Sequence, residues 1–328
     1  MIKKNMINNK TLLVTGGTGS FGKNFIQLTL KKYNPKKIIV YSRDEMKQWF
    51  MAKELEEYKN KIQFIIGDVR DSGRLNHCCR KVDYIFHAAA TKIIPTAESN
   101  PEECVKTNIN GAINVIDAAI KNQVSKVVAL STDKACNPIN LYGATKLASD
   151  KLFISANFNS SHKTKFSIVR YGNVISSRGS IIPYFKSLSK KGVFPITDLK
   201  MTRFFLSLDD AVKLVWLSLS KMTGGEIFVK KIPSILITDI AKAINPNAKF
   251  KVIGIRPGEK INEQLISEDD SRFTYDFNEY YKILPSLAKN ISSYKKGGIK
   301  VKSNFFYSSN NNSEWLNVKK IKKIIEKN

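Results

Sequence analysis

A glycine-rich turn follows a short apolar run near the start of this 328-residue chain and limits the folds that it can adopt. The run TLLVT leads into GGTGSFG, which spaces Gly16, Gly19 and Gly22 three apart, and a helical pattern continues from Ser20 to about Tyr33. Glycines at this spacing let the backbone approach a pyrophosphate, which then rests at the helix N-terminus. The turn therefore predicts a strand, a turn and a helix that bind a dinucleotide.

Four more apolar runs follow, each separated from the next by a segment long enough for a helix. They read KIIVYS, IQFIIGD, VDYIFHAAA and KVVALST. Strands that alternate with helices form a parallel sheet covered on both faces, and ligands bind at the carboxyl ends of its strands. We therefore predict an α/β fold: a Rossmann-type doubly wound parallel sheet with a smaller, interleaved C-terminal substrate domain.

The pattern loosens after FSIVRYGNV, where prolines separate short elements. We place the dinucleotide-binding domain at residues 1–170 and the substrate domain at 171–328. The helical LDDAVKLVWLSLS and the strand-like GEIFV predict that residues 204–232 return to the sheet. The Asn- and Ser-rich YSSNNNSEW predicts a surface loop.

The chain has a formal net charge of +26, which suits nucleic acid, an anionic surface or a polyanionic small substrate. Because the basic residues are spread along the chain, we expect only weak, salt-sensitive DNA binding and no specific nucleic-acid partner. The tail VKKIKKIIEKN is locally dense in lysine, and Val318, Ile321, Ile324 and Ile325 share one helical face. This face favours a docked C-terminal helix over a membrane-bound or partner-binding one.

Other classes of protein find little support. No segment reaches the apolar length of a membrane-spanning helix, and the opening MIKKNMINNK lacks the apolar run of a signal peptide. The four cysteines, Cys78, Cys79, Cys104 and Cys136, have no metal-binding spacing. We therefore expect a cytoplasmic protein with no membrane partner and no metal.

The residues after the second predicted strand indicate which dinucleotide binds. Ser42 and Arg43 stand where an NAD enzyme usually has a carboxylate for the ribose 2′-hydroxyl, and an arginine there can hold a 2′-phosphate. Together with Lys47 they favour NADP. Asp44 keeps NAD open, and Arg43 and Lys47 also fit a solvated helix start.

The ends of the third and fourth predicted strands complete the dinucleotide site. Asp68 can hold the adenine amine, and the small Ala88, Ala89 and Ala90 let a cofactor lie close. His87 is interpreted as a core histidine. The predicted cofactor-binding residues are Gly16, Thr18, Gly19, Ser20, Phe21, Gly22, Ser42, Arg43, Lys47, Asp68, Val69, Ala88, Ala89, Ala90, Asn108, Tyr142 and Lys146.

The segment STDKACNPINLYGATK carries the candidate catalytic residues. Tyr142 and Lys146, at i and i+4, share one helix face. A free tyrosine titrates near roughly 10, so it accepts a proton at neutral pH only beside a cation, which Lys146 supplies. Thr132 completes a hydrogen-bonding trio around a substrate hydroxyl. A simple oxidoreductase does not need Asp133 and Lys134, which could also form a surface ion pair.

These motifs resemble a known family. TGGTGSFG with YGATK resembles the extended short-chain dehydrogenase/reductases. YSRDEMKQ, HAAATKIIPTAESNP, LSTDKACNPINLYGATKLASDKLF, RYGNVISSRGSIIP, MTRFF and GIRPGEK resemble the inverting UDP-N-acetylglucosamine 4,6-dehydratases, from about Lys10 to Trp315. The resemblance implies a lyase that begins pseudaminic acid synthesis for flagellin glycosylation. It also implies UDP-N-acetylglucosamine as substrate, a bound and recycled NADP, and a homo-oligomer, either a dimer or a hexamer.

The resemblance also implies a role for each catalytic residue. Oxidation of sugar carbon 4 acidifies the carbon 5 proton, so the carbon 6 hydroxyl can leave before the hydride returns to carbon 6. Tyr142 would be the base for the carbon 4 hydroxyl, with Lys146 as its cation and Thr132 as its hydrogen-bond partner. Asp133 would protonate the leaving hydroxyl and Lys134 would remove the carbon 5 proton. These roles require a protonated Asp133 and a neutral Lys134.

Family positions in the second domain supply the sugar-nucleotide ligands. Arginines suit a diphosphate because their planar fork makes bidentate contacts. The implied substrate-binding residues are Lys92, Asn173, Arg178, Thr202, Arg203, Arg256 and Glu259. Alternatives are a related UDP-sugar dehydratase or epimerase of capsule or O-antigen synthesis, and a catalytically silent NADP-binding sensor. The Asp133 and Lys134 pair argues against a simple epimerase, and the intact Tyr142 and Lys146 pair argues against a sensor.

Overall fold

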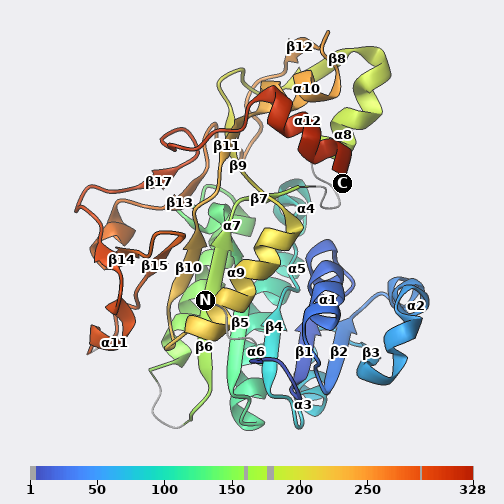
Figure 1. Cartoon of the computed structure of the whole chain (residues 1–328), viewed down its shortest axis with the longest axis vertical. Helices are drawn as coiled ribbons and strands as arrows, with labels where there is room; N and C mark the ends of the chain where they lie inside the picture. The colour runs from blue at the N-terminus through green and yellow to red at the C-terminus, as the bar shows by residue number, and fades with distance from the viewer. Residues whose placement is uncertain (1–4, 159–161, 176–180, 289, 328) are drawn as a thin grey trace.

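A computed structural model of the chain describes residues 5–158, 162–175, 181–288 and 290–327. Ten strands of these residues form one sheet, in the order β16-β14-β15-β10-β6-β5-β4-β1-β2-β3 (Figure 1). Their bounds are β1 (Thr11–Thr15), β2 (Lys37–Ser42), β3 (Ile62–Ile66), β4 (Tyr84–His87), β5 (Lys126–Thr132), β6 (Lys165–Tyr171), β10 (Ile227–Lys230), β14 (Thr274–Asp276), β15 (Tyr280–Ile283) and β16 (Ile299–Lys300).

Neighbouring strands are paired in parallel along one part of this sheet, which consists of β3, β2, β1, β4, β5, β6 and β10 in that order. The order 3-2-1-4-5-6 within this part is the doubly wound arrangement, and it reverses direction between β1 and β4. The predicted α/β fold is confirmed. Because a crevice opens at the carboxyl ends of the strands where the order reverses, β1 and β4 mark the place for a ligand.

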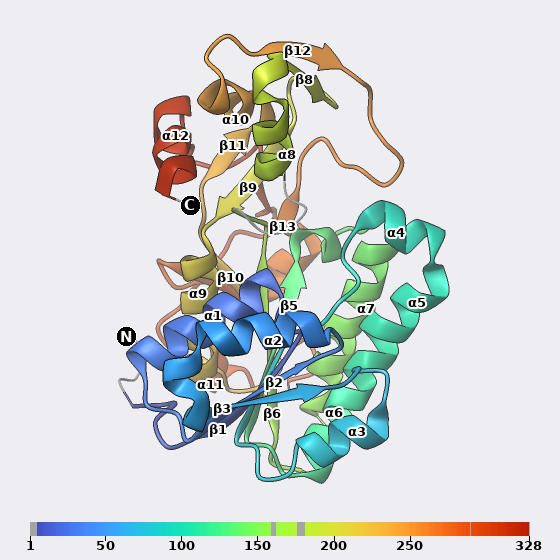
Figure 2. The same cartoon turned by 90° about the vertical axis from the view of Figure 1, so that its right-hand side faces the viewer.

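Helices cover both faces of the sheet, which explains why its central parallel strands are mainly apolar. Leu12, Leu13 and Val14 of β1 are fully buried. In Figure 2, α3, α6 and α7 lie on one side of the sheet and α1 and α9 on the other. The bounds are α1 (Ser20–Lys32), α3 (Ser72–Cys78), α6 (Gly111–Lys121), α7 (Leu141–Ala156) and α9 (Leu208–Lys221); α2 (Glu45–Glu54), α4 (Ile94–Ser99) and α5 (Pro101–Val105) precede α6 in the chain.

Later parts of the chain add to the same sheet. β10 pairs with β6, and the helix before it, α9, packs on α1. Residues 274–300 then contribute β15, β14 and β16, which are joined to β10 and to each other in antiparallel pairs. The predicted domain boundary at residue 171 stays a prediction, and the sheet draws strands from both sides of it.

A second hydrophobic core lies beyond the carboxyl ends of the strands, at the top of Figure 1. Phe185, Phe194 and Ile240 are buried in it. Its elements are β7 (Asn173–Val174), α8 (Ile181–Leu188), β8 (Val193–Ile196), β9 (Thr202–Leu206), β11 (Ser234–Leu236), α10 (Ile237–Ile244), β12 (Lys249–Val252) and α12 (Val318–Lys327). Below it are β13 (Gln264–Ile266), β17 (Tyr307–Ser308) and α11 (Ser292–Lys295).

The C-terminal helix α12 is docked, as its apolar stripe predicts. It packs on α10, and Ile321 and Ile325 are buried in the second core while the lysines between them are exposed. The prediction of a surface loop over YSSNNNSEW is wrong for its first three residues. Residues 307–309 are buried, because β17 pairs with β13 and the Tyr307 hydroxyl bonds with the backbone of Ile232.

Within the described ranges, no helix combines the length and the hydropathy needed to cross a bilayer. The four cysteines are buried free thiols. No three His, Cys, Asp or Glu side chains of these same ranges gather as metal ligands.

Candidate active site

A cavity of about 760 Å³ lies at the carboxyl ends of the strands, between the sheet and the second core. The turns after β1, β2, β4 and β5 line one side of it, and residues 171–174 with parts of the described segment 181–263 line the other. The predicted cofactor residues lie along the first side and most of the predicted substrate residues along the second. The fold therefore brings together two sets of residues that are far apart in the chain.

The glycine turn lies at the carboxyl ends of β1 and β4, where Gly16, Gly19 and Gly22 line the cavity. Gly16 has a left-handed backbone (φ +65°), and a Cβ atom on it would lie 2.8 Å from the backbone nitrogen of Ala89. A Cβ atom on Gly22 would lie 2.6 Å from the Cα atom of Gly17. Gly19 precedes α1 and provides no side-chain cap, so an anion at this end can accept hydrogen bonds from the first helical turn. This cradle fits the pyrophosphate of a dinucleotide.

The end of β2 contributes the residues predicted to select the dinucleotide. Arg43 lines the cavity with a 62% exposed side chain, and its Nη1 lies 3.7 Å from Oδ2 of Asp68. Asp44 accepts a hydrogen bond from the backbone of Lys47 and caps α2, and the Lys47 ammonium pairs with the same carboxylate. The Ser42 hydroxyl is buried and accepts a hydrogen bond from Gln48. Asp44 is thus committed to the helix start, whereas Arg43 remains accessible to a ligand.

Most of the remaining predicted cofactor residues also reach the cavity. Its lining includes Thr18, Ser20, Phe21, Asp68, Val69, Ala88, Ala89 and Ala90. Asn108 is outside the lining, because its buried amide bonds with the backbone of Thr91 and the hydroxyl of Thr145. His87 lies in the core, where its Nδ1 is 2.8 Å from Oγ1 of Thr15.

The five candidate catalytic residues meet at one end of the cavity. Thr132 ends β5, Asp133 and Lys134 form the short 3-10 turn that follows, and α7 carries Tyr142 and Lys146 one turn apart. All five line the cavity. The Thr132 hydroxyl donates a hydrogen bond of 2.9 Å to Oδ1 of Asp133. The interpretation of Asp133 and Lys134 as a surface ion pair is wrong, since Asp133 is 1% exposed.

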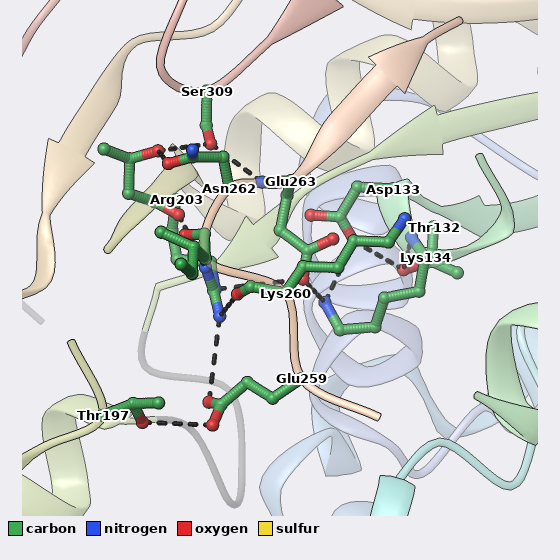
Figure 3. Close-up of polar contacts among 12 residues, drawn as sticks. Thr132, Asp133, Lys134, Thr197, Arg203, Glu259, Lys260, Asn262, Glu263 and Ser309 are labelled. Atoms are coloured by element: carbon green, nitrogen blue, oxygen red, sulfur yellow. Dashed lines mark hydrogen bonds and ion pairs between the residues drawn. The ribbon is translucent and has the colours of Figure 1, made fainter. Parts of the chain in front are cut away.

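Lys134 bridges two carboxylates (Figure 3). Its Nζ lies 3.1 Å from Oδ1 of Asp133 and 3.2 Å from Oε1 of Glu263. Burial opposes the ammonium charge, but these two carboxylates outweigh it and raise the Lys134 pKa above its ordinary value. The neutral Lys134 that the carbon 5 proton transfer requires is therefore not the resting form. Its proton must leave before it can act as a base.

Tyr142 and Lys146 have opposite pKa shifts with the same main cause. Burial raises the pKa of Tyr142 to about 12, while the nearby Lys134 charge and the Thr132 hydroxyl lower it. Burial also lowers the pKa of Lys146, against the attraction of Asp150. Desolvation disfavours whichever form is charged, so both the Tyr142 phenolate and the Lys146 ammonium are less stable in this site than in water.

The predicted substrate residues divide into those that reach the cavity and those that do not. Lys92, Asn173, Arg203, Arg256 and Glu259 line it. Thr202 does not, because its hydroxyl donates to Asn262 and contacts Ser309 in the layer behind. Arg178 lies outside the described residues.

Two of the arginines already have protein partners. Arg203 donates hydrogen bonds to the backbone carbonyls of Thr202, Lys260 and Ile261. Arg256 makes a two-pronged pair with Glu259, at 3.0 and 2.7 Å, and has a 64% exposed side chain. Arg203 therefore holds the loop that follows Arg256, and of the two Arg256 is the more accessible to a diphosphate.

Sequence reasoning missed Glu263, which lies four positions beyond Glu259. The surrounding sequence INEQ, residues 261–264, has no periodicity or motif that marks a buried carboxylate. Its contact with Lys134 could not be read from sequence spacing, because the two belong to segments that meet only in the folded chain.

The fold, the glycine cradle and the Tyr142 and Lys146 pair define an extended short-chain dehydrogenase/reductase. A family model described as "Polysaccharide biosynthesis protein" matches residues 12–285, and the chain belongs to this family. It is 53% identical, over 98% of both chains, to a protein of Campylobacter jejuni subsp. jejuni serotype O:23/36 (strain 81-176) named UDP-N-acetylglucosamine 4,6-dehydratase (inverting).

Other relatives have different names. The chain is 40% identical to a UDP-glucose 4-epimerase of Rickettsia canadensis, over 98% of this chain and 96% of that one. Among solved structures, Pen from Bacillus thuringiensis has a TM-score of 0.89 at 35% identity and 98% coverage of both chains. DesIV, a dTDP-glucose 4,6-dehydratase from Streptomyces venezuelae solved with NAD and TYD, has a TM-score of 0.69 at 22% identity, covering 76% of this chain and 86% of that one. At that identity the likeness supports the fold alone.

Proposed function

We propose that this protein catalyses the NADP-dependent 4,6-dehydration of UDP-N-acetylglucosamine with inversion at carbon 5, the first step of pseudaminic acid synthesis. The product would be UDP-2-acetamido-2,6-dideoxy-β-L-arabino-hexos-4-ulose. The observation that carries the proposal is the pair of the buried Asp133 and the half-buried Lys134 between Thr132 and Tyr142, within a chain 53% identical to a relative named for this reaction. The pair supplies the acid and the base that an elimination needs and a simple oxidation does not.

NADP is the cofactor that we propose. The cradle at Gly16, Gly19 and Gly22 suits its pyrophosphate, and the accessible Arg43 suits its 2′-phosphate. When bound, this cofactor would accept a hydride from sugar carbon 4 and return it to carbon 6, so it would be recycled within each turnover.

Three residues would carry out the oxidation of carbon 4. Tyr142 takes the proton of the carbon 4 hydroxyl, and the Thr132 hydroxyl beside it orients that group. Lys146, one helical turn along α7, stabilises the phenolate that Tyr142 must become. The neighbouring Lys134 charge also favours this phenolate.

Two residues would then carry out the elimination. Transfer of the Lys134 proton to Asp133, 3.1 Å away, leaves a neutral amine and a protonated carboxyl. The Lys134 amine then removes the carbon 5 proton, and Asp133 gives its proton to the departing carbon 6 hydroxyl, which leaves as water. Both side chains lie in a buried site, where proton transfer is less hindered by competing water. Reprotonation of carbon 5 from the opposite face would give the inverted sugar.

The sugar nucleotide would be held by the second side of the cavity. Arg256 and Glu259 present a charged pair at the cavity wall, and Lys92 and Asn173 line it nearby. We keep Arg178 and Arg203 as proposed diphosphate ligands, with Arg203 contributing after its loop contacts rearrange. We also propose a homo-oligomer, a dimer or a hexamer, in the cytoplasm.

A simple 4-epimerase is the second candidate, because relatives with that name are about 40% identical. It needs Thr132, Tyr142 and Lys146, but it has no elimination for which Asp133 and Lys134 would be required. The fate of the carbon 4 hydrogen separates the two reactions.

The decisive experiment places deuterium on carbon 4 of UDP-N-acetylglucosamine and follows it by NMR. A dehydratase moves the label to carbon 6 of the same molecule, with no net accumulation of NADPH. An epimerase returns the label to carbon 4, an ordinary dehydrogenase passes it to free cofactor, and a sensor moves nothing. Label found anywhere but carbon 6 would falsify the dehydratase assignment.

A second experiment follows carbon 5. Reaction in heavy water should place one deuterium there, and the coupling constants of the ring protons report which face received it. Lys134→Ala should slow the elimination while cofactor binding is kept. If Lys134→Ala dehydrates the sugar at the normal rate, Lys134 is not the base.

A further inference from the structure

Glu263 lies at the meeting point of the charged groups in the active site. Its side chain is 3% exposed, and its Oε1 lies 3.2 Å from Nζ of Lys134 and 3.9 Å from Nε of Arg203. Oδ1 of Asp133 is 3.1 Å from the same Lys134 nitrogen. One ammonium group is therefore bound by two carboxylates, one from the adjacent residue and one from a distant segment.

Each of these carboxylates keeps one oxygen unpaired. Oε2 of Glu263 and Oδ2 of Asp133 are buried and have no hydrogen-bond partner among the described residues. A buried acceptor without a donor costs free energy, and an ion pair with a purely structural role gains nothing from it. Both residues line the cavity together with Tyr142 and Lys146, so the two carboxylates belong to the reacting end of the site.

The backbone of Glu263 is fixed from several directions. Its N–H donates to the Ser309 hydroxyl at 3.0 Å, and its carbonyl accepts from the Ser309 N–H at 2.8 Å. The Thr202 hydroxyl lies 2.6 Å from the Ser309 hydroxyl, and Arg203 holds the carbonyls of residues 260 and 261 (Figure 3). The Glu263 carboxylate is thus presented to Lys134 by a rigid support.

We propose that Glu263 is a positioning residue for the elimination, holding the Lys134 amine and its proton beside Asp133. This inference rests on the proposed function, in which Lys134 removes the carbon 5 proton. Lys134 is faced by Asp133, Glu263, Arg203 and Tyr142. Glu263 sets both where the amine lies and how firmly it keeps its proton.

The substitution Glu263→Gln removes the charge of this side chain and keeps its shape. Burial and Arg203 lower the Lys134 pKa, whereas Asp133 and Glu263 raise it. Removal of one attracting carboxylate must therefore lower that pKa. A lower pKa leaves more Lys134 neutral at any given pH, so the acid limb of the elimination rate moves to lower pH.

The first test needs no substrate. The Lys134 pKa is measured by NMR in the full-length protein with ¹³C-labelled lysine, its signal being assigned by its loss in Lys134→Met. Glu263→Gln should lower this pKa by about one unit or more, as expected for the loss of an opposite charge within about 4 Å. The exposed Glu268→Gln should leave it unchanged. An unchanged pKa in Glu263→Gln overturns the inference.

The second test is kinetic. Glu263→Gln should lower kcat by about tenfold or more through misplacement of the amine, and should enlarge the isotope effect of deuterium on carbon 5. Glu263→Asp keeps the negative charge but places it on a shorter side chain, farther from Lys134. The value of kcat should therefore fall, while the acid limb of the elimination rate should stay closer to its original pH. An isotope effect and a pH profile identical to those of the unmodified enzyme would show a merely structural residue. If the unmodified protein moves no label from carbon 4 to carbon 6, the proposed function fails, and the NMR titration still decides the contact.

Discussion

Nη1 of Arg43 lies 3.7 Å from Oδ2 of Asp68, so the ends of the adjacent strands β2 and β3 present an exposed guanidinium beside a carboxylate. We expect NADP to bind more tightly than NAD, because the 2′-phosphate can take this guanidinium as a charge-assisted partner. Arg43→Asp should weaken NADP binding by about 10- to 100-fold and reverse the preference, as measured by calorimetry.

The exposed Lys121→Asp, at the end of α6, makes the same charge change away from the cavity and serves as the control. Equal affinities for the two dinucleotides in the unmodified protein would contradict the role of Arg43.

Tyr142→Phe should stop the reaction before elimination, since the base for the carbon 4 hydroxyl is lost. We expect kcat to fall at least about 100-fold while NADP binding is kept. Because burial raises the Tyr142 pKa to about 12, the oxidation rate of the unmodified enzyme should increase with pH across the neutral range. Loss of deuterium from carbon 4 measures this step, with Tyr58→Phe, outside the cavity lining, as the control. Near-normal oxidation by Tyr142→Phe would exclude this assignment.

His87 should make the fold sensitive to acid. Burial, with a smaller effect of the Lys146 charge, lowers its pKa from 6.5 to about 3. The unfolded chain therefore binds a proton at His87 below about pH 6.5 while the folded chain does not, so stability falls as pH decreases through this window. The loss should reach about 2 kcal/mol at about pH 5.

His87→Gln removes this titration, although it also changes the contact with Thr15. The difference in urea-unfolding free energy between the two proteins should therefore shrink as pH falls from about 7 to about 5. A difference that does not vary with pH would show that His87 becomes protonated in the folded state.

Ile321→Asp should unseat α12 from α10, because it places a charge in the second hydrophobic core. We expect a loss of about 3 kcal/mol or more in unfolding free energy. Lys322→Asp, on the exposed side of the same helix, should change it by less than about 1 kcal/mol. Equal effects of the two substitutions in urea denaturation would mean that the stripe is not the docking face.

Features that depend on residues close together in the chain could be predicted from the amino-acid sequence. The glycine spacing after an apolar run defines the turn between β1 and α1, because steric limits act on each residue locally. Tyr142 and Lys146 had to share a helix face, since helical geometry sets the direction of residues four apart. The alternation of apolar runs with helix-length segments predicted the parallel sheet, because each strand and each helix is recognised from residues close together in the chain.

Contacts between distant segments could be seen only in the folded chain. The burial of residues 307–309 depends on β13, the donors of Arg203 are taken by a loop far along the chain, and residues 274–300 join the sheet at its antiparallel edge. The raised pKa of Lys134 depends on Glu263 as well as on the adjacent Asp133, and no local pattern connects Glu263 to Lys134. Electrostatic and packing energies depend on distance and burial in space, and a linear pattern records neither for residues that meet only when the chain folds.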